Sequence, residues 1–209
     1  MTAPHRIALP LLLLLAAALL AGCGKSAPTH FYSLNSGQAA PTQEGAPAQE
    51  AKPAKAPCFS LGVGPVDFPA YLDRAQMVVR QGGNQMQVAD FEQWVEPLQE
   101  NFKRVLLENL EGSLCASPLV LHPWPVGVRP DYQVALQVLR FDGAPAHTAV
   151  LRASWSILDS QGELLVWKSS TLQESVAGPG YDALAAAQSR LVARLSQEIA
   201  QAFGGLKKK

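Results

Sequence analysis

Three cysteines carry the most distinctive chemistry in this chain of 209 residues. Cys23 follows Leu20–Gly22 at the end of an apolar run, where small residues fit a peptidase cleft and the thiol can accept a diacylglycerol. Cys58 and Cys115 lie at the edges of predicted elements, and two such cysteines often pair in an oxidising compartment. A disulfide between them would contribute about 4 kcal/mol in the chain-entropy model. Two buried thiols are the alternative.

The first 22 residues have the pattern of a signal peptide. His5 and Arg6 form a short basic region, and an apolar run follows from Ile7 to Ala21, whereas a membrane span needs about 20 residues. The end of this run, Leu20–Cys23, resembles the lipobox of bacterial lipoproteins; an ordinary secretory signal with a chance cysteine is the alternative. We therefore predict cleavage before Cys23 and attachment there of acyl chains such as palmitate, two of which suffice for stable anchoring.

The residue after Cys23 bears on which membrane holds the protein. By resemblance to enterobacterial lipoproteins, an Asp at this position would retain the protein in the inner membrane, and Gly24 stands there instead. The sequence therefore favours the inner leaflet of the outer membrane, facing the periplasm. Lys25 leaves the inner membrane open, because sorting rules differ between bacterial groups. Residues 207–209 are a basic tail that either contacts anionic headgroups or stays in solvent.

The other polar residues form no pattern typical of catalysis. The four histidines are scattered without metal-ligand spacing, and no nucleophile elbow, phosphate-binding glycine loop or metalloprotease helix occurs in the sequence. Basic and acidic residues balance at 17 each, and loss of Arg6 with the signal peptide leaves 16 against 17. Such a balance does not fit nucleic-acid binding. We expect a protein that is not an enzyme, with no metal and no cofactor beyond the covalent lipid on Cys23.

A change of composition divides the mature chain. Residues 36–57 contain no aromatic or large aliphatic side chain, so they are predicted to form a disordered loop. The stretch His30–Leu34 just before this loop has strand character. If it joins the sheet, the lipidated tether is 23–29, of which residues 24–29 reach about 20 Å; otherwise the tether runs to residue 57. We favour the first geometry and assign 30–206 to a single domain.

Hydrophobic periodicity predicts two helices and several strands in the body of the chain. Apolar residues recur at helical spacing from Pro97 to about Gly112 and from Tyr181 to Phe203. Strands are predicted where β-rich stretches alternate or flank turn sequences, at 58–66, 76–80, 85–89, 118–122, 132–141, 149–158 and 163–171. This order indicates an α+β fold, with two helices packed on one face of a mostly antiparallel sheet.

Three segments resemble the ABC-type transport auxiliary lipoprotein family, of which the paraquat-inducible PqiC lipoprotein is the best-known type. They are Phe31–Leu34, Leu61–Gln76 and Trp94–Leu98. With the lipobox, the resemblance covers nearly the whole mature chain apart from 36–57. It implies a non-catalytic subunit of an ABC/MCE-type lipid transport system, in which mammalian-cell-entry (MCE) proteins bridge the periplasm and carry phospholipids. The lipoprotein would dock this bridge at the outer membrane and support membrane integrity, and a homo-oligomeric ring is a further expectation.

The segment around residue 70 is the expected contact site for a partner or a second copy. It places aromatic and aliphatic side chains beside charges, and interface hot spots favour aromatic and Arg side chains. The candidate residues are Phe68, Pro69, Tyr71, Leu72, Asp73 and Arg74. In the alternative interpretation, Tyr71 and Leu72 cover the edge of the core while Asp73 and Arg74 pair locally. Trp94, Trp155 and Trp167 are expected in the core rather than at a lipid site.

Two other function classes fit the sequence. One is an outer-membrane assembly or scaffold lipoprotein, and the other is a periplasmic lipid-binding carrier with its own apolar cavity. Co-purification from detergent separates the classes, because each would retain a different companion: an MCE protein, a β-barrel, or a bound lipid.

Overall fold

The computed structural model describes residues 27–36 and 59–206 of the chain. The predicted signal peptide, Cys23, Cys58, residues 37–57 of the predicted loop and the basic tail lie outside these ranges. No helix within the described ranges is long and apolar enough to cross a membrane.

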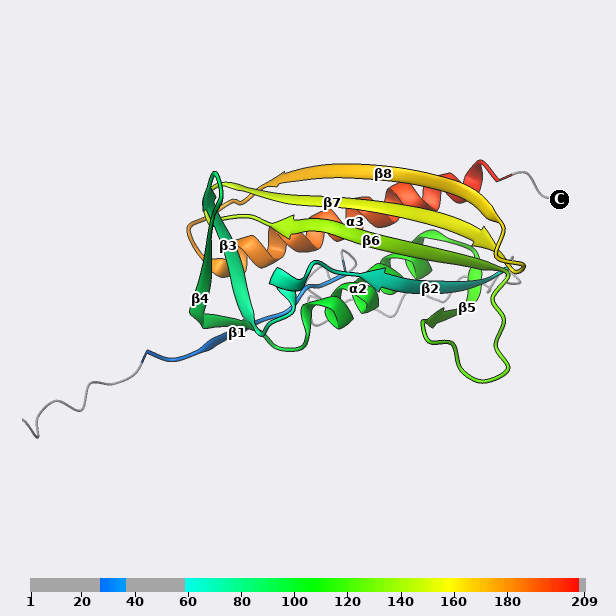
Figure 1. Ribbon diagram of the computed structural model, residues 1–209, viewed down its shortest axis with the longest axis horizontal. Helices are drawn as coiled ribbons and strands as arrows, with labels where there is room; N and C mark the ends of the chain where they lie inside the picture. The colour runs from blue at the N-terminus through cyan, green and yellow to red at the C-terminus, as the bar shows by residue number, and fades with distance from the viewer. Residues whose placement is uncertain (1–26, 37–58, 207–209) are drawn as a thin grey trace, which may run out of the picture.

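The described residues form two sheets and a layer of two helices (Figure 1). The smaller sheet has the strand order β1-β4-β3, and the larger has the order β5-β2-β6-β7-β8. In chain order the elements are β1 (His30–Tyr32), β2 (Phe59–Asp67), the short 3-10 helix η1 (Ala70–Leu72), β3 (Gln76–Gly82), β4 (Gln85–Trp94), α2 (Leu98–Ser113), β5 (Ala116–Leu121), β6 (Tyr132–Asp142), β7 (Thr148–Asp159), β8 (Leu164–Ser175) and α3 (Tyr181–Gly204).

Both helices cover one face of the larger sheet, which confirms the predicted α+β fold (Figure 1). Strands β6, β7 and β8 are antiparallel, as their turn sequences predict. The sheet is mixed rather than purely antiparallel, because β2 runs parallel to both of its neighbours, β5 and β6. Parallel neighbours need a long connection, and β2 reaches β5 through β3, β4 and α2. Turn sequences reveal direction only for strands that are adjacent in the sequence.

The helices occupy the segments that their apolar spacing predicts. Helix α2 begins directly after Pro97, whose missing N–H leaves no helical hydrogen bond unmade at this position. Every apolar residue of its predicted stripe is buried, namely Leu98, Phe102, Val105, Leu106 and Leu110. The stripe of α3 is buried in the same way along Leu184, Ala187, Leu191, Leu195 and Ile199. The two helices also contact each other, so their stripes close the core from one side.

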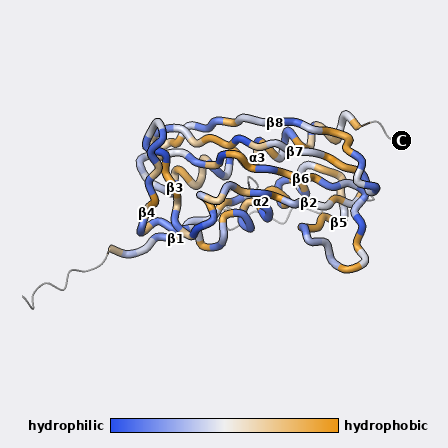
Figure 2. Tube along the Cα trace, viewed as in Figure 1, coloured by the Kyte–Doolittle hydropathy of each residue, from blue (hydrophilic) through white to orange (hydrophobic). Residues whose placement is uncertain are grey.

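The core lies between the helices and the larger sheet, and apolar stretches follow both layers (Figure 2). Trp155 is buried on the inward face of β7, and its Nε1 donates to Ser170 Oγ at 3.0 Å. Trp94 is also buried. The prediction that Trp167 belongs to the core is wrong: its side chain is 64% exposed. It lies opposite Ser156 on the face of the sheet that the helices do not cover.

The smaller sheet contains the predicted hairpin and the predicted strand near residue 30. The hairpin of β3 and β4 turns at Gly82 and Gly83, both with positive φ, which glycine adopts without strain. Strand β1 pairs in parallel with the end of β4, which confirms that the His30–Leu34 stretch joins a sheet, although the strand ends at Tyr32. The Arg80 N–H donates to the Gly143 carbonyl at 3.0 Å, and this bond joins the smaller sheet to the larger.

Candidate partner-binding site

A groove of about 490 Å³ lies between the η1 segment and the connection from β4 to α2. One wall includes Phe68, Leu72 and Arg74, and the other includes Trp94 and Leu98. The lining residues 68, 70 and 72–75 belong to the segment Leu61–Gln76, and residues 94–98 are the whole of Trp94–Leu98; Pro69 and Tyr71 do not line the groove. Two of the three segments that carry the sequence resemblance therefore form the two sides of one groove.

The first wall is fixed to the core by its apolar residues. Pro69 precedes η1, and its carbonyl accepts a hydrogen bond from the Leu72 N–H at 2.9 Å. This turn directs Leu72 inward, where it is buried, while Phe68 packs edge-to-face on Phe102 of α2 at 5.1 Å between ring centres. Phe68 and Leu72 thus form a rigid apolar floor for the groove.

Tyr71 faces a buried carboxylate that the sequence did not reveal. Its hydroxyl donates to Asp142 Oδ2 at 3.0 Å, and Asp142, at the end of β6, is fully buried. Arg80 binds the same carboxylate through Nε and Nη2 at 3.1 and 2.9 Å, and Arg140 binds it through Nε at 2.8 Å. This cluster joins η1, β3 and β6, so the groove wall is tied to both sheets.

The cluster shifts the ionisation of both acidic groups. Burial and the charge of Asp142 raise the pKa of Tyr71 to about 12. Burial also pushes the pKa of Asp142 upward, but hydrogen bonds from Arg80 and Arg140 lower it by more, so this pKa lies below its ordinary value. Asp142 is therefore ionised and Tyr71 is protonated at neutral pH.

Asp73 and Arg74 lie at the rim of the groove and are exposed. Arg74 Nε donates to the Tyr71 carbonyl at 3.1 Å, and the two side chains form no ion pair among those of the described residues. The six predicted contact residues thus divide into a part held by the core and a charged rim that is open to solvent.

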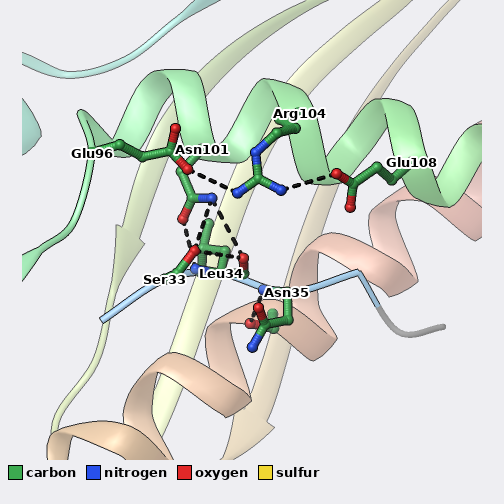
Figure 3. A network of polar contacts seen from close by, with 8 residues as sticks. Ser33, Leu34, Asn35, Glu96, Asn101, Arg104 and Glu108 are labelled. Carbon is green, nitrogen blue, oxygen red and sulfur yellow. Dashed lines mark hydrogen bonds and ion pairs between the residues drawn. The ribbon is translucent and has the colours of Figure 1, made fainter. Parts of the chain in front are cut away.

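The second wall is held by polar contacts along the first turns of α2. Arg104 lies between Glu96 and Glu108 and binds them at 2.8 and 2.9 Å (Figure 3). Gln99 Nε2 donates to the Val66 carbonyl of β2 at 2.6 Å. Glu96 is thereby oriented at the mouth of the groove. Sequence periodicity placed these residues on a helix but gave no sign of which of them would line a groove.

The N-terminal strand is fastened next to the groove. The Val95 N–H donates to the Tyr32 carbonyl at 2.9 Å, and the Leu34 N–H donates to Oδ1 of the buried Asn101 at 2.6 Å (Figure 3). Leu34 is itself fully buried. The segment that follows the predicted tether is therefore held between α2 and the smaller sheet, and its place relative to the groove is fixed.

The cysteine predictions fall largely outside the described ranges. Cys115 takes part in a disulfide, but its partner lies outside the described residues, so the pairing with Cys58 stays a prediction. Cys23 is also outside them. Within residues 27–36 and 59–206, no three metal-ligating side chains gather into a group that could hold a metal ion.

Two proteins of known crystal structure resemble this chain in fold. An uncharacterized protein of known crystal structure shares 21% identity, with a TM-score of 0.65 over 85% of this chain and 99% of the other. The crystal structure of protein XCC0632 from Xanthomonas campestris, of the DUF330 family, shares 17% identity, with a TM-score of 0.63 over 82% and 93% of the two chains. These likenesses show a shared fold. No curated protein sequence matches the chain.

A match to a protein-family model assigns the chain to a family, which the shared fold alone does not do. The model described as "ABC-type transport auxiliary lipoprotein component" matches residues 41–200, which is more than half of the chain. The matched range contains both walls of the groove, helix α2 and most of helix α3. This chain therefore belongs to the ABC-type transport auxiliary lipoprotein family.

Proposed function

We propose that this protein is a non-catalytic, lipid-anchored subunit of an ABC/MCE-type phospholipid transport system. In this proposal it is held by acyl chains on Cys23 in the inner leaflet of the outer membrane, faces the periplasm, and docks the MCE bridge to support membrane integrity. One observation carries the proposal: two segments that resemble the family, separated in the sequence by the β3–β4 hairpin, meet in a single groove.

The groove has the properties of a site for a protein side chain. Its floor is apolar at Phe68, Leu72 and Leu98, and its rim carries both charges, with Arg74 on one side and Glu96 on the other. Apolar centres with polar rims are typical of protein interfaces. A volume of about 490 Å³ accommodates one or two large side chains. We propose that the MCE partner inserts an apolar anchor residue here and pairs with the rim charges.

Because both walls are fixed, the groove suits docking of a partner better than a role in which the groove must change conformation. The Asp142 cluster holds the first wall, and the Arg104 contacts hold the second. Binding to preformed walls avoids the entropy cost of ordering them. The family description, an auxiliary component of ABC-type transport, agrees with a binding role.

Co-purification tests this function and separates it from the alternatives. The full-length protein, extracted in mild detergent from its own host, should bring down an MCE-domain protein. Arg74→Glu should reduce this capture, whereas Arg152→Glu should not, because Arg152 is an exposed charge on β7 that does not line the groove. Recovery of a β-barrel instead would favour the scaffold function, and a bound lipid on the lone protein would favour the carrier function.

A further inference from the structure

Three exposed apolar side chains gather on one face of the smaller sheet. Phe91 and Gln93 lie on one face of β4, and β1 pairs Phe31 with Gln93, so Phe31 shares this face. Val95 directly follows β4 and continues the alternation, with its N–H bonded to the Tyr32 carbonyl. Phe31 is 61% exposed, Phe91 46% and Val95 63%. We call Phe31, Phe91 and Val95 the aromatic face.

The strands that carry this face are held in place by contacts on their opposite face. On the opposite face of the same strands, the Tyr32 hydroxyl and His30 Nδ1 bind the Glu92 carboxylate at 2.5 and 3.1 Å. Tyr32 also packs near Tyr181 of α3. The strands are thus held firmly on one side, while the other side presents two phenylalanines to solvent. Neighbouring exposed aromatic side chains on an ordered sheet mark an interaction surface.

The position of the face along the chain indicates its occupant. Phe31 is eight residues after Cys23, so it lies at most about 28 Å from the lipidated sulfur along an extended chain. The bonds from Leu34 to Asn101 and from Val95 to Tyr32 prevent β1 from swinging away from the domain. The aromatic face is consequently kept within reach of the bilayer that holds the acyl chains.

We propose that the aromatic face rests in the headgroup region of the bilayer that anchors the protein. This inference rests on the lipid anchor of the proposed function. The face itself is uncharged. The residue between Phe91 and Val95 on this face is the neutral Gln93, and the His30–Glu92 pair lies on the opposite face. Aromatic side chains favour the membrane interface. Val95 also borders the groove, so insertion of Phe31 and Phe91 sets the groove mouth beside the membrane surface and gives it one orientation.

Fluorescence of the full lipidated protein in vesicles tests this contact. An environment-sensitive fluorescent amino acid is placed at Phe91 and, as a matched control, at Val126, which is fully exposed in the β5–β6 connection at the opposite end of the molecule from β1 (Figure 1). In vesicles of phosphatidylethanolamine and phosphatidylglycerol, we expect a blue shift and quenching by spin-labelled lipid at position 91 alone. Equal, water-like emission at both positions overturns the proposal.

A second arm measures the contribution of the side chains. The mature chain with Cys23→Ser has no acyl chains, so its vesicle binding reports contacts of the protein surface without the anchor, and the basic tail at 207–209 is the same in every variant compared. Phe31→Ser should weaken this binding by roughly tenfold, whereas Leu164→Ser, at an exposed position in β8, should not. Unchanged binding after Phe31→Ser contradicts the proposal. Protection of position 91 by a second copy or an MCE protein, but not by lipid, overturns it in favour of a protein contact.

Fatty-acid labelling of the wild-type protein separates failure of the proposed membrane contact from failure of the proposed lipid anchor. If label is incorporated but position 91 stays in water, the membrane-facing surface is wrong while the lipoprotein function stands. If no label is incorporated, the anchor itself fails, and the argument from the distance to Cys23 fails with it.

Discussion

Tyr71→Phe tests the claim that a buried cluster fixes the groove wall. The substitution keeps the ring and removes only the hydroxyl that donates to Asp142 at 3.0 Å. A hydrogen bond to a charged group is worth about 1.5–3 kcal/mol. Tyr71 is only half-buried, and Asp142 keeps its bonds to Arg80 and Arg140. We therefore expect the lower end of this range, a loss of about 1.5 kcal/mol in the free energy of unfolding.

Urea unfolding and thermal melting of the mature chain measure this loss. For a chain of this size, about 1.5 kcal/mol corresponds to a decrease in Tm of about 3–6 °C. Tyr132→Phe is the matched control, because the Tyr132 ring packs on Phe59 and Phe203 while its hydroxyl has no hydrogen bond among the described residues. Its effect should stay within about 0.5 kcal/mol.

A double-mutant cycle decides whether Asp142 is responsible. In an Asp142→Asn background, Tyr71→Phe should cost clearly less than in the wild type, because the charged acceptor is gone. A Tyr71→Phe variant as stable as the wild type, or one with the same loss in both backgrounds, would refute the cluster as the element that holds this wall. Tyr71→Ala also removes the ring and should cost about 3 kcal/mol, so it is a poorer probe of docking than Arg74.

Four further predictions follow from the chemistry of single residues. Cys23→Ser should abolish incorporation of a fatty-acid analogue, and label retained on this variant would contradict lipidation at Cys23. Non-reducing and reducing gels should differ in mobility if Cys58 and Cys115 are bridged; two free thiols counted in the denatured, unreduced chain would exclude the bridge. Arg74→Glu should weaken capture of the MCE partner while leaving Tm within about 2 °C of the wild type, because Arg74 is exposed and makes one hydrogen bond. Asp142 has a pKa below its ordinary value in the folded state, so its contribution is full above the unfolded pKa near 4 and is lost as pH falls through the folded pKa; Asp142→Asn should therefore remove part of the acid destabilisation, measured by Tm between pH 7 and 3.

Local structure was predictable because its signals lie within short windows. The stripe that includes Phe102 and Leu106 could only be a helix, and Gln81–Asn84 joins two β-rich stretches closely enough to require a hairpin. Burial of Trp155 followed from its place among alternating apolar residues. The prediction for Trp167 failed because a strand covered by helices on one face alone exposes every second residue. Composition does not indicate which residues of the strand face the helices.

Long-range pairings were not predictable from the residues alone. The parallel neighbours of β2 are distant in sequence, so no turn sequence specifies their direction. The Asp142 carboxylate meets Tyr71 and Arg80 across separations of 71 and 62 residues, and an Asp at a strand end gives no hint of buried partners. The two family-like segments meet because the β3–β4 hairpin pairs Gln76 with Gln93, but no residue pattern indicated that a groove would open between them.

Site-specific photocrosslinking in intact cells tests the docking groove most directly. A photoreactive amino acid replaces Arg74 at the groove rim or, as a control, Leu164, which is exposed at the start of β8 and away from the groove. We expect that an MCE-domain protein is captured from position 74 and not from position 164. Capture of that protein equally from both positions, or from neither while the lipoprotein is correctly anchored, would contradict it.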